Sequence, residues 1–403
     1  MTDVVRSIQS FNAWRDPDRL QLKMAKMRTS PFIFLRGTCH VFYDQLPDAD
    51  VFRNAPNAWV CGDLHLENFG SYKGDNRLVY FDMNDFDEAC LAPVSWELVR
   101  FLTSVLLGMR DLKVERADQL MMCHAFLDAY AAALTEGKAR WVERETSDGL
   151  IKQLLTSLQE RSRPKFLDSR TELKGKRRNV RIDGKKALAV TEQQRAEVES
   201  FIGAFAATQP DPQFYKVLDV GRRIAGTGSL GVARYIVLVE GKGSPDANYL
   251  LDLKQAVPSA LVPHLTVRQP NWESEAHRVV SVQRRVQAVS MAFLQAVEMD
   301  GKPFILRGLQ PSEDRVALDS AREKPKQIGA VLRTMGEVVA WGQLRSSGRN
   351  GSAIADELID FGRRTDWKRP LLEAVDAVSA QVESDWKAFS KAYDDGFYRL
   401  ASV

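Results

Sequence analysis

The sequence contains few of the residues that build metal clusters or disulfide scaffolds. Its 403 residues include only four cysteines and five histidines. No two cysteines form a Cys-x-x-Cys pair, and each stands among apolar or helix-forming residues: Cys39, Cys61, Cys90 and Cys123. We therefore expect buried, reduced thiols rather than a disulfide framework.

Long apolar runs and a signal sequence are also lacking. No apolar stretch approaches the roughly 18 residues that suggest a membrane-spanning helix, and the N-terminal MTDVVRSIQSFNAWRD has no apolar core or cleavage pattern of a secretory signal. The net charge is +3, with 44% apolar and 27% charged residues. This balance is ordinary for a globular protein and excludes a polycation. We expect a cytoplasmic protein without a membrane partner. Nucleic acid is not the expected partner, because its binding would need a local basic patch, for which the segment 161–186 is the one candidate.

The spacing of apolar residues predicts an α+β fold. Helical periodicity covers much of residues 1–50 and continues from Ser95 to about Arg144. Residues 213–256 instead contain three runs rich in Val, Ile, Leu and Tyr, separated by Gly-rich turns, which predict strands. Beyond them we expect a helix over 274–297, a strand over 303–306 and mainly helices from residue 326 onward.

The most informative segment is the loop GDLHLENFG, from Gly62 to Gly70. Asp63 and Asn68 are five residues apart, so one loop can aim both side chains into one site. An acid that accepts a hydroxyl proton and an amide that binds Mg²⁺ have this spacing in kinase catalytic loops. We group His65 with Asp63 as a catalytic-loop residue and expect it to hold the loop by hydrogen bonding. The segment predicts phosphoryl or nucleotidyl transfer with ATP and Mg²⁺.

An acidic cluster that follows offers the second metal ligand. Asp82 ends the apolar run 78–81, at a distance from Asn68 that suits a short hairpin. Asp85, in Asp85-Phe-Asp87, is the more literal match to the Asp-Phe-Gly metal motif of kinases. Because Mg²⁺ takes few protein ligands and completes its shell with phosphates, one amide and one carboxylate suffice. We favour Asp82 slightly on geometry and keep Asp85 beside it.

A glycine-rich motif lies between two predicted strands. It comprises Gly226, Gly228, Ser229 and Gly231, and the β-branched run 232–239 follows it. A dinucleotide-binding loop would open a helix instead. A strand, a Gly-rich loop and a strand form the hairpin that covers ATP phosphates in kinases, although a plain hairpin turn remains the alternative.

Lys254 lies on the next predicted strand, in LLDLKQA. The strand after the Gly-rich hairpin carries the kinase lysine that pairs with the α- and β-phosphates and with a helix glutamate. We expect that role for Lys254. Glu273 and Glu275, near the start of the next helix, are candidate partners, and a partner other than these two is the alternative. Arg222 and Arg223 either reach phosphate or are ordinary surface arginines.

The segment 161–186 is strongly basic. Eleven arginines and lysines face only three acids there, and Gly175 and the pair Asp183-Gly184 interrupt it. These turn residues predict a mobile hairpin or insertion. Three interpretations of this segment stay open: a solvated connector, a lid over the site, or a surface that binds anions. Thr191-Glu-Gln-Gln194 then fits a capping box that opens a helix to about residue 207.

The loop 62–70, the strand and acids after it, and PVSWELVRFLTS together resemble the aminoglycoside and choline phosphotransferase branch of the protein-kinase-like superfamily. That branch has His before its Gly-Asp, whereas this chain has Cys61. A longer set of segments is similar to an uncharacterised bacterial family, domain of unknown function 2252. The matching segments are KMAKMRTSPFIFLRG, GDLHLENFG, FDMNDFDEACLAPVSWELVR, DVGRRIAGTGSLGVARYIVLVEG and FILRGLQPSEDRV.

The resemblance implies a bilobal kinase-like fold whose parts are circularly permuted, because the catalytic loop precedes the Gly-rich loop. The helix around 335–345 resembles the one that leads into a kinase catalytic loop. The implied units are an N-terminal helical segment of the large lobe at 1–50, its catalytic-loop and metal-binding part at 51–160, a basic insertion and linking helix at 161–207, a β-rich nucleotide-binding lobe at 208–325, and C-terminal large-lobe helices at 326–403.

These features predict an ATP- and Mg²⁺-dependent phosphotransferase whose acceptor is a small molecule or a protein. A flipped nucleotide would deliver AMP with the same residue types, and a non-catalytic nucleotide-binding protein is a further alternative. Gly62-Asp63-x-His65 also resembles the first metal block of metallophosphoesterases. That class needs further histidine blocks, and none of the five histidines lies in one.

Overall fold

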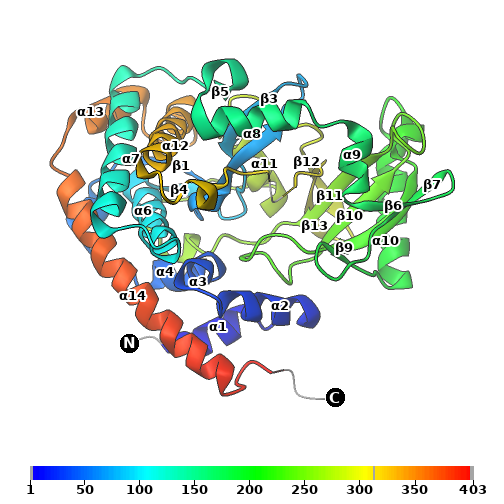
Figure 1. Ribbon diagram of the computed structural model, residues 1–403, viewed down its shortest axis with the longest axis horizontal. Helices are drawn as coiled ribbons and strands as arrows, with labels where there is room; N and C mark the ends of the chain where they lie inside the picture. The colour runs from blue at the N-terminus through cyan, green and yellow to red at the C-terminus, as the bar shows by residue number, and fades with distance from the viewer. Residues whose placement is uncertain (1–2, 312–313, 400–403) are drawn as a thin grey trace.

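The computed structural model describes residues 3–311 and 314–399 and shows an α+β protein. Helices gather on the left of Figure 1 and a large sheet lies on the right. Within the described residues, no helix has the length and apolar character needed to cross a membrane. All four cysteines are buried and free, as expected.

The large sheet is antiparallel and has six strands in the order β12-β13-β11-β10-β9-β8. Its three central strands confirm the prediction over 213–256. The strands are β8 (Ala187–Leu188), β9 (Val217–Arg223), β10 (Arg234–Val239), β11 (Tyr249–Gln255), β12 (Gln295–Met299) and β13 (Lys302–Gly308).

One expected helix is too long. The prediction of a helix over 274–297 is wrong in its second half, because α11 (Glu275–Val286) ends at Val286 and β12 begins at Gln295. Val297 pairs with Phe304 in the ladder between β12 and β13. The hairpin to β13 therefore overrides the local helical spacing, which tertiary pairing commonly does for short apolar runs.

The two faces of the sheet have different covers. Alternate residues of β10 and β11, such as Val237 and Leu251, pack with Val198 and Ile202 of α10 (Glu192–Ala207). The expected capping box of α10 is present, because Thr191 and Gln194 each accept from the other's backbone N–H at 3.1 Å.

The basic segment 161–186 covers part of the other face. It folds as α9 (Arg163–Asp168) and a hairpin of β6 (Thr171–Lys174) and β7 (Arg177–Val180). Leu167 and Val180 join an apolar cluster with Ile236 and Leu238 of the sheet. The segment is therefore a packed hairpin rather than a purely solvated connector.

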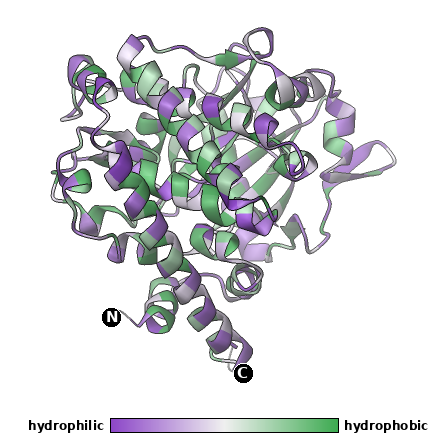
Figure 2. Ribbon diagram, turned by 60° about the vertical axis from the view of Figure 1, so that its left-hand side comes forward, coloured by the Kyte–Doolittle hydropathy of each residue, from purple (hydrophilic) through white to green (hydrophobic). Residues whose placement is uncertain are grey.

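Long helices form the other half of the molecule. The helix α12 packs along α7, and α14 packs against α6, α1 and α3. Figure 2 shows hydrophobic residues gathered in the interior between these helices. The helices are α1 (Val4–Asn12), α2 (Pro17–Met27), α3 (Pro31–Gly37), α4 (Cys39–Asp44), α5 (Asp50–Arg53), α6 (Val94–Asp111), α7 (Arg116–Glu136), α8 (Gly149–Gln159), α12 (Pro325–Arg345), α13 (Ala355–Arg363) and α14 (Lys368–Asp394).

Two further antiparallel sheets position the loops between the helices and the large sheet. The strand β1 (Asn57–Val60) pairs with β4 (Cys90–Pro93). The strand β2 (Phe69–Lys73) pairs with β3 (Val79–Met83), which also pairs with β5 (Val142–Glu143). The loops 61–68 and 84–89 therefore leave neighbouring strands and meet.

Candidate active site

Asn68 joins these two loops. Its Nδ2 donates to the backbone oxygen of Asp63 at 3.1 Å and to that of Asp85 at 3.3 Å. Gly62 has a φ of +83°, and a Cβ there would stand 2.3 Å from the carbonyl oxygen of Glu88. A glycine is therefore needed where the loops cross. Asn68 lines a cavity of about 480 Å³ that lies between the helices and the large sheet. Its amide oxygen is left for a contact in this cavity.

Asp63 is held by Arg100 of α6. Its Oδ1 accepts from Nε of Arg100 at 2.8 Å and from Nη2 at 2.5 Å. Burial raises the pKa of Asp63 above its ordinary value, and the charge of Arg100 opposes the rise only in part. A carboxylate whose pKa moves toward neutrality is better matched to accept a hydroxyl proton.

No role was predicted for Arg100 from the sequence, although it lies in the stretch PVSWELVRFLTS that resembles the kinase-like families. In that stretch, Glu97 Oε1 accepts from the backbone N–H of Cys61 at 2.7 Å, and Arg100 reaches Asp63 one turn later. An acid and an arginine spaced i, i+3 on a helix face the same side. This spacing is the signal that identifies Arg100.

His65 has the expected structural surroundings. Its Nδ1 accepts from the backbone N–H of Glu67 at 3.2 Å, which leaves the proton of the neutral ring on Nε2. Burial, with the neighbouring charge of Arg36, lowers the pKa of His65 well below its ordinary value. A neutral imidazole in this place can fix the loop, and its Nε2–H is available as a donor.

The acids after β3 have separate environments. Asp85 is half-exposed and lines the cavity, with Oδ1 3.8 Å from Nζ of Lys254. Burial would raise the pKa of Asp85, but Lys254, Arg307 and Arg234 outweigh it and hold that pKa below its ordinary value. Asp85 is therefore ionised and faces the cavity, as a metal ligand must.

Asp82 does not face the cavity, although it was the favoured candidate. Its Oδ2 lies 3.6 Å from Nη2 of Arg345, and its Oδ1 accepts from the N–H of Met83 at 2.8 Å. Burial raises the pKa of Asp82 to about 6, with Arg345 opposing the rise. Asp82 is part of β3, and its side chain points into the helical region.

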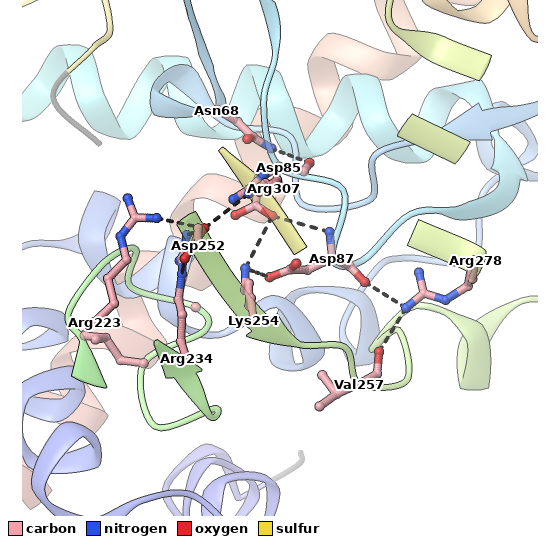
Figure 3. Close-up of polar contacts among 12 residues, drawn as sticks. Asn68, Asp85, Asp87, Arg223, Arg234, Asp252, Lys254, Val257, Arg278 and Arg307 are labelled. Carbon is pink, nitrogen blue, oxygen red and sulfur yellow. Dashed lines mark hydrogen bonds and ion pairs between the residues drawn. The ribbon is translucent and has the colours of Figure 1, made fainter. Parts of the chain in front are cut away.

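Lys254 pairs with acids of the loop rather than with a helix glutamate. Its Nζ bonds Asp87 and lies beside Asp85 (Figure 3). Of the expected partners, Glu275 Oε2 instead accepts from Nε of Arg278 at 2.6 Å, and Glu273 lies 3.3 Å from His277. Neither Glu273 nor Glu275 is therefore the partner of Lys254, because Glu275 contacts Arg278 of its own helix and Glu273 contacts His277.

The Gly-rich loop lies over the loop 62–70. A Cβ on Gly228 would be 3.0 Å from the backbone oxygen of Arg36 and 3.5 Å from Oδ2 of Asp63. Gly226 and Gly231 have φ of +73° and +90°, which favour glycine. Gly226, Gly228 and Ser229 line the cavity.

Side chains from the N-terminal helices hold the Gly-rich loop by its carbonyl groups. Lys23 donates to the oxygen of Gly228 at 3.0 Å, and Arg15 donates to the oxygens of Gly228 and Leu230 at 2.5 and 2.8 Å. Lys23 is fully buried, and this burial lowers its pKa well below the ordinary value. Neither residue was predicted from the sequence, because both lie more than 200 positions from the loop along the chain.

An arginine cluster occupies the sheet face beside Lys254. The fully buried carboxylate of Asp252 lies 2.7 Å from Arg223, 2.6 Å from Arg234 and 3.2 Å from Arg307 (Figure 3). These guanidinium groups hold the pKa of Asp252 well below its usual range despite burial. Arg223 thus lies in the cavity, while Arg222 pairs with Asp16 at 3.0 Å on the other side of β9.

Together these parts enclose a cavity of about 480 Å³. One wall is the Gly-rich loop and the arginine cluster, and the other is the loop 62–70 with Asp85, Asp87 and Glu88. Lys254 lies behind Asp87 and is almost fully buried. The expected site residues therefore surround one cavity, apart from Asp82, while Gly231 supports the loop behind it.

Comparison with known proteins gives a family and no further relative. Residues 15–392 match the sequence model of a family described as "Uncharacterized protein conserved in bacteria", domain of unknown function 2252. No curated protein and no solved structure matches the chain.

Proposed function

The chain belongs to this family of uncharacterized bacterial proteins, and we propose that it is a kinase-like transferase that uses ATP and Mg²⁺ to modify a hydroxyl acceptor. The observation that carries the proposal is the meeting of two distant sets of residues. Lys254 bonds Asp87, 167 positions away in the chain, and the Gly-rich loop approaches Asp63. One nucleotide with its metal would touch both sets.

The order of parts in the sheet region supports this proposal. A Gly-rich loop joins β9 to β10, the lysine lies on β11, and a helix and two strands follow. Protein kinases place the Gly-rich loop, the lysine and the next helix in this order. The helix glutamate that pairs with the lysine in those enzymes is replaced here by loop acids.

The ends of α12 and β1 support the proposed permutation. The backbone N–H of Ala353 donates to the oxygen of Asn57 at 2.7 Å, and Nε1 of Trp59 donates to the oxygen of Arg349 at 2.9 Å. The chain that leaves α12 thus lies beside the strand that enters the catalytic loop. In an unpermuted kinase these two segments would be consecutive.

The residues fit a nucleotide-bound Mg²⁺. Among the described residues there is no group of three or more His, Cys, Asp or Glu side chains that could hold a metal by itself. Asn68 and Asp85 nevertheless present one amide and one carboxylate to the cavity, and Mg²⁺ normally takes its other ligands from phosphates and water. The bound ion would neutralise charge that develops on the phosphates.

The chain's own residues then have separate tasks. Asp63, oriented by Arg100, accepts the proton of the acceptor hydroxyl. Lys254 and the N–H groups of the Gly-rich loop bind phosphate oxygens, which orients the nucleotide. Phosphoryl transfer, AMP transfer and nucleotide binding without chemistry use the same cavity. A metallophosphoesterase is disfavoured because His65 is buried and accepts from Glu67.

Two substitutions separate these tasks. Asp63→Asn keeps the shape but cannot accept the proton, so ATP turnover should fall by about 10²-fold or more while Mg·ATP affinity stays within about threefold. Lys254→Ala should weaken Mg·ATP binding by roughly tenfold or more, since it removes a charged phosphate partner. Titration calorimetry and ATP consumption measure the two effects. Loss of binding in Asp63→Asn together with unchanged binding in Lys254→Ala would refute these roles.

A further inference from the structure

A second group of cations lines the cavity besides the arginine cluster. It consists of Lys26 of α2, Arg36 of α3 and Arg315 of the segment between β13 and α12, and we call it the basic triad. One oxygen of Glu67, Oε2, contacts Nη1 of Arg36 and Nη1 of Arg315. Burial and the charge of Arg36 lower the pKa of Lys26, while the charge of Glu67 opposes this change. All three cations therefore lie around Glu67.

The acids of the cavity leave the triad with an excess of positive charge. Within the described residues, Glu67 is the one carboxylate at ion-pair distance from Arg36 or Arg315, and none lies that close to Lys26. The charges of Asp63 and Asp85 also act on Arg36, but more weakly than those of Glu67 and Arg315. Every other acid that lines the cavity has a partner outside the triad: Asp63 contacts Arg100, Asp314 contacts Arg161, Asp85 and Asp87 contact Lys254, and Glu88 accepts from the N–H of Ala260. Three cations thus share one carboxylate.

Arg36 also has a donor that the protein does not use. Its side chain is 11% exposed, and its Nε is buried without a hydrogen-bond partner among the residues that the structure describes. An unpaired buried donor is costly, and a guanidinium presents its donors in a planar fork that matches phosphate oxygens. The triad is therefore suited to bind a doubly charged anion such as a phosphate group.

Polar contacts place the triad beside Asp63. Nη2 of Arg100 donates to Oδ1 of Asp63 at 2.5 Å and to the backbone oxygen of Leu35, the residue before Arg36, at 2.9 Å. From the Gly-rich loop, a Cβ on Gly228 would be 3.0 Å from the backbone oxygen of Arg36 and 3.5 Å from Oδ2 of Asp63. An anion on the triad would therefore lie next to the proposed proton acceptor.

The nucleotide phosphates have a separate set of cations in the proposed function. Lys254 belongs to the large sheet, where the arginine cluster lies beside it, whereas the triad comes from α2, α3 and the segment after β13. No described carboxylate forms ion pairs with both sets, because Glu67 contacts the triad, while Asp85, Asp87 and Asp252 contact the sheet residues. The triad is therefore available for a second ligand.

We propose, on the basis of the proposed function, that the basic triad binds a phosphate group of the acceptor, so that the protein modifies a hydroxyl group of a phosphorylated molecule. The phosphate accepts from Arg36 and Arg315 and is further attracted by Lys26. The hydroxyl group of the same molecule then lies at Asp63, and the nucleotide phosphates lie at Lys254.

The first test measures phosphate binding beside a bound nucleotide. In the full chain, inorganic phosphate is titrated calorimetrically at saturating Mg²⁺ and β,γ-imido-ATP, and acetate is titrated as a carboxylate probe. Phosphate should bind at least about tenfold more tightly than acetate, and Arg315→Gln should weaken phosphate binding roughly tenfold while nucleotide affinity stays within about twofold. Arg28→Gln is the matched control and should change neither affinity, because Arg28 is 39% exposed and pairs with Asp394, whereas Arg315 is 38% exposed.

Four results of this titration would overturn the proposal. They are the absence of phosphate binding beside the nucleotide, equal binding of acetate, an unchanged phosphate affinity in Arg315→Gln, and displacement of the nucleotide by phosphate. A protein that binds no Mg²⁺ nucleotide would instead refute the proposed function. The phosphate titration without nucleotide, on the same two variants, then tests the triad by itself.

The second test compares acceptors that differ by one phosphate group. ATP consumption is measured with glycerol and glycerol 3-phosphate, and with glucose and glucose 6-phosphate. Faster consumption with the phosphorylated member of a pair, and a KM for it that rises in Arg315→Gln, support the proposal. Equal or faster consumption with the unphosphorylated member contradicts it. If neither member reacts, the phosphate titration decides.

Discussion

At the scale of residues, the surroundings of the two carboxylates Asp82 and Asp85 separate their roles. Asp82 lies within β3 and faces Arg345 among the helices, while Asp85 follows the strand and faces the cavity. From the sequence alone, Asp82 and Asp85 were both candidate metal ligands, because the sequence shows where a carboxylate lies along the chain and not which side of the strand it faces. The burial and charges around each side chain make the distinction.

Asp85→Asn and Asp82→Asn should therefore behave differently. Removing the charge of Asp85 should lower the affinity for Mg·ATP by about tenfold or more, because a proposed metal ligand is lost. Asp82→Asn should leave that affinity within about twofold. Titrations at several Mg²⁺ concentrations would show the difference, and equal loss in both variants would place the metal elsewhere.

Single residues that act through distant contacts were the least predictable. Asp63, Asn68 and the glycines have diagnostic spacing, so a motif identifies them. Asp252 and Arg307 have none, because each is a charged residue whose two neighbours in the strand are apolar residues or glycine. Their meeting depends on the ladder that pairs Asp252 with Arg307 across β11 and β13. A charged residue at a central strand position is nevertheless a signal, since burial of an unpaired charge is costly.

At the scale of elements, local sequence patterns predicted whether a segment is a helix or a strand better than they predicted where it ends. The capping box placed the start of α10 correctly. The apolar spacing after Val286 suggested a continuing helix, but pairing with β13 produced β12. The basic segment showed its turns in the sequence, while its few apolar residues gave little indication that it would cover the sheet. Such docking depends on the receiving surface as well as on the segment.

Leu167 of α9 tests whether this docking stabilises the protein. It is almost fully buried against the sheet, whereas Leu173 in the neighbouring β6 is half-exposed. Leu167→Ala should lower the free energy of unfolding by about 2–4 kcal/mol, because a buried side chain is removed and a cavity remains. Leu173→Ala should change it by less than about 0.5 kcal/mol. Urea denaturation measures both, and equal small effects would show that the segment is only loosely attached.

At the scale of the whole molecule, the chain builds one cavity from segments that are far apart in sequence. Arg15 and Lys23, from the N-terminal part of the chain, hold the Gly-rich loop, and Arg100 of α6 holds the loop 62–70. The α+β class followed from apolar spacing. The convergence was expected only because both motifs would have to touch one nucleotide, and composition alone contains no such information.

Hydrogen–deuterium exchange with and without Mg·ATP tests this convergence most directly. Binding in the cavity should slow exchange both in residues 226–231 and in residues 62–70, since one ligand would cover both loops. The protection should be clearly weaker in Lys254→Ala at a nucleotide concentration that is just sufficient to saturate the wild type. A folded protein in which millimolar Mg·ATP protects neither loop, or protects only one of them, would contradict the account.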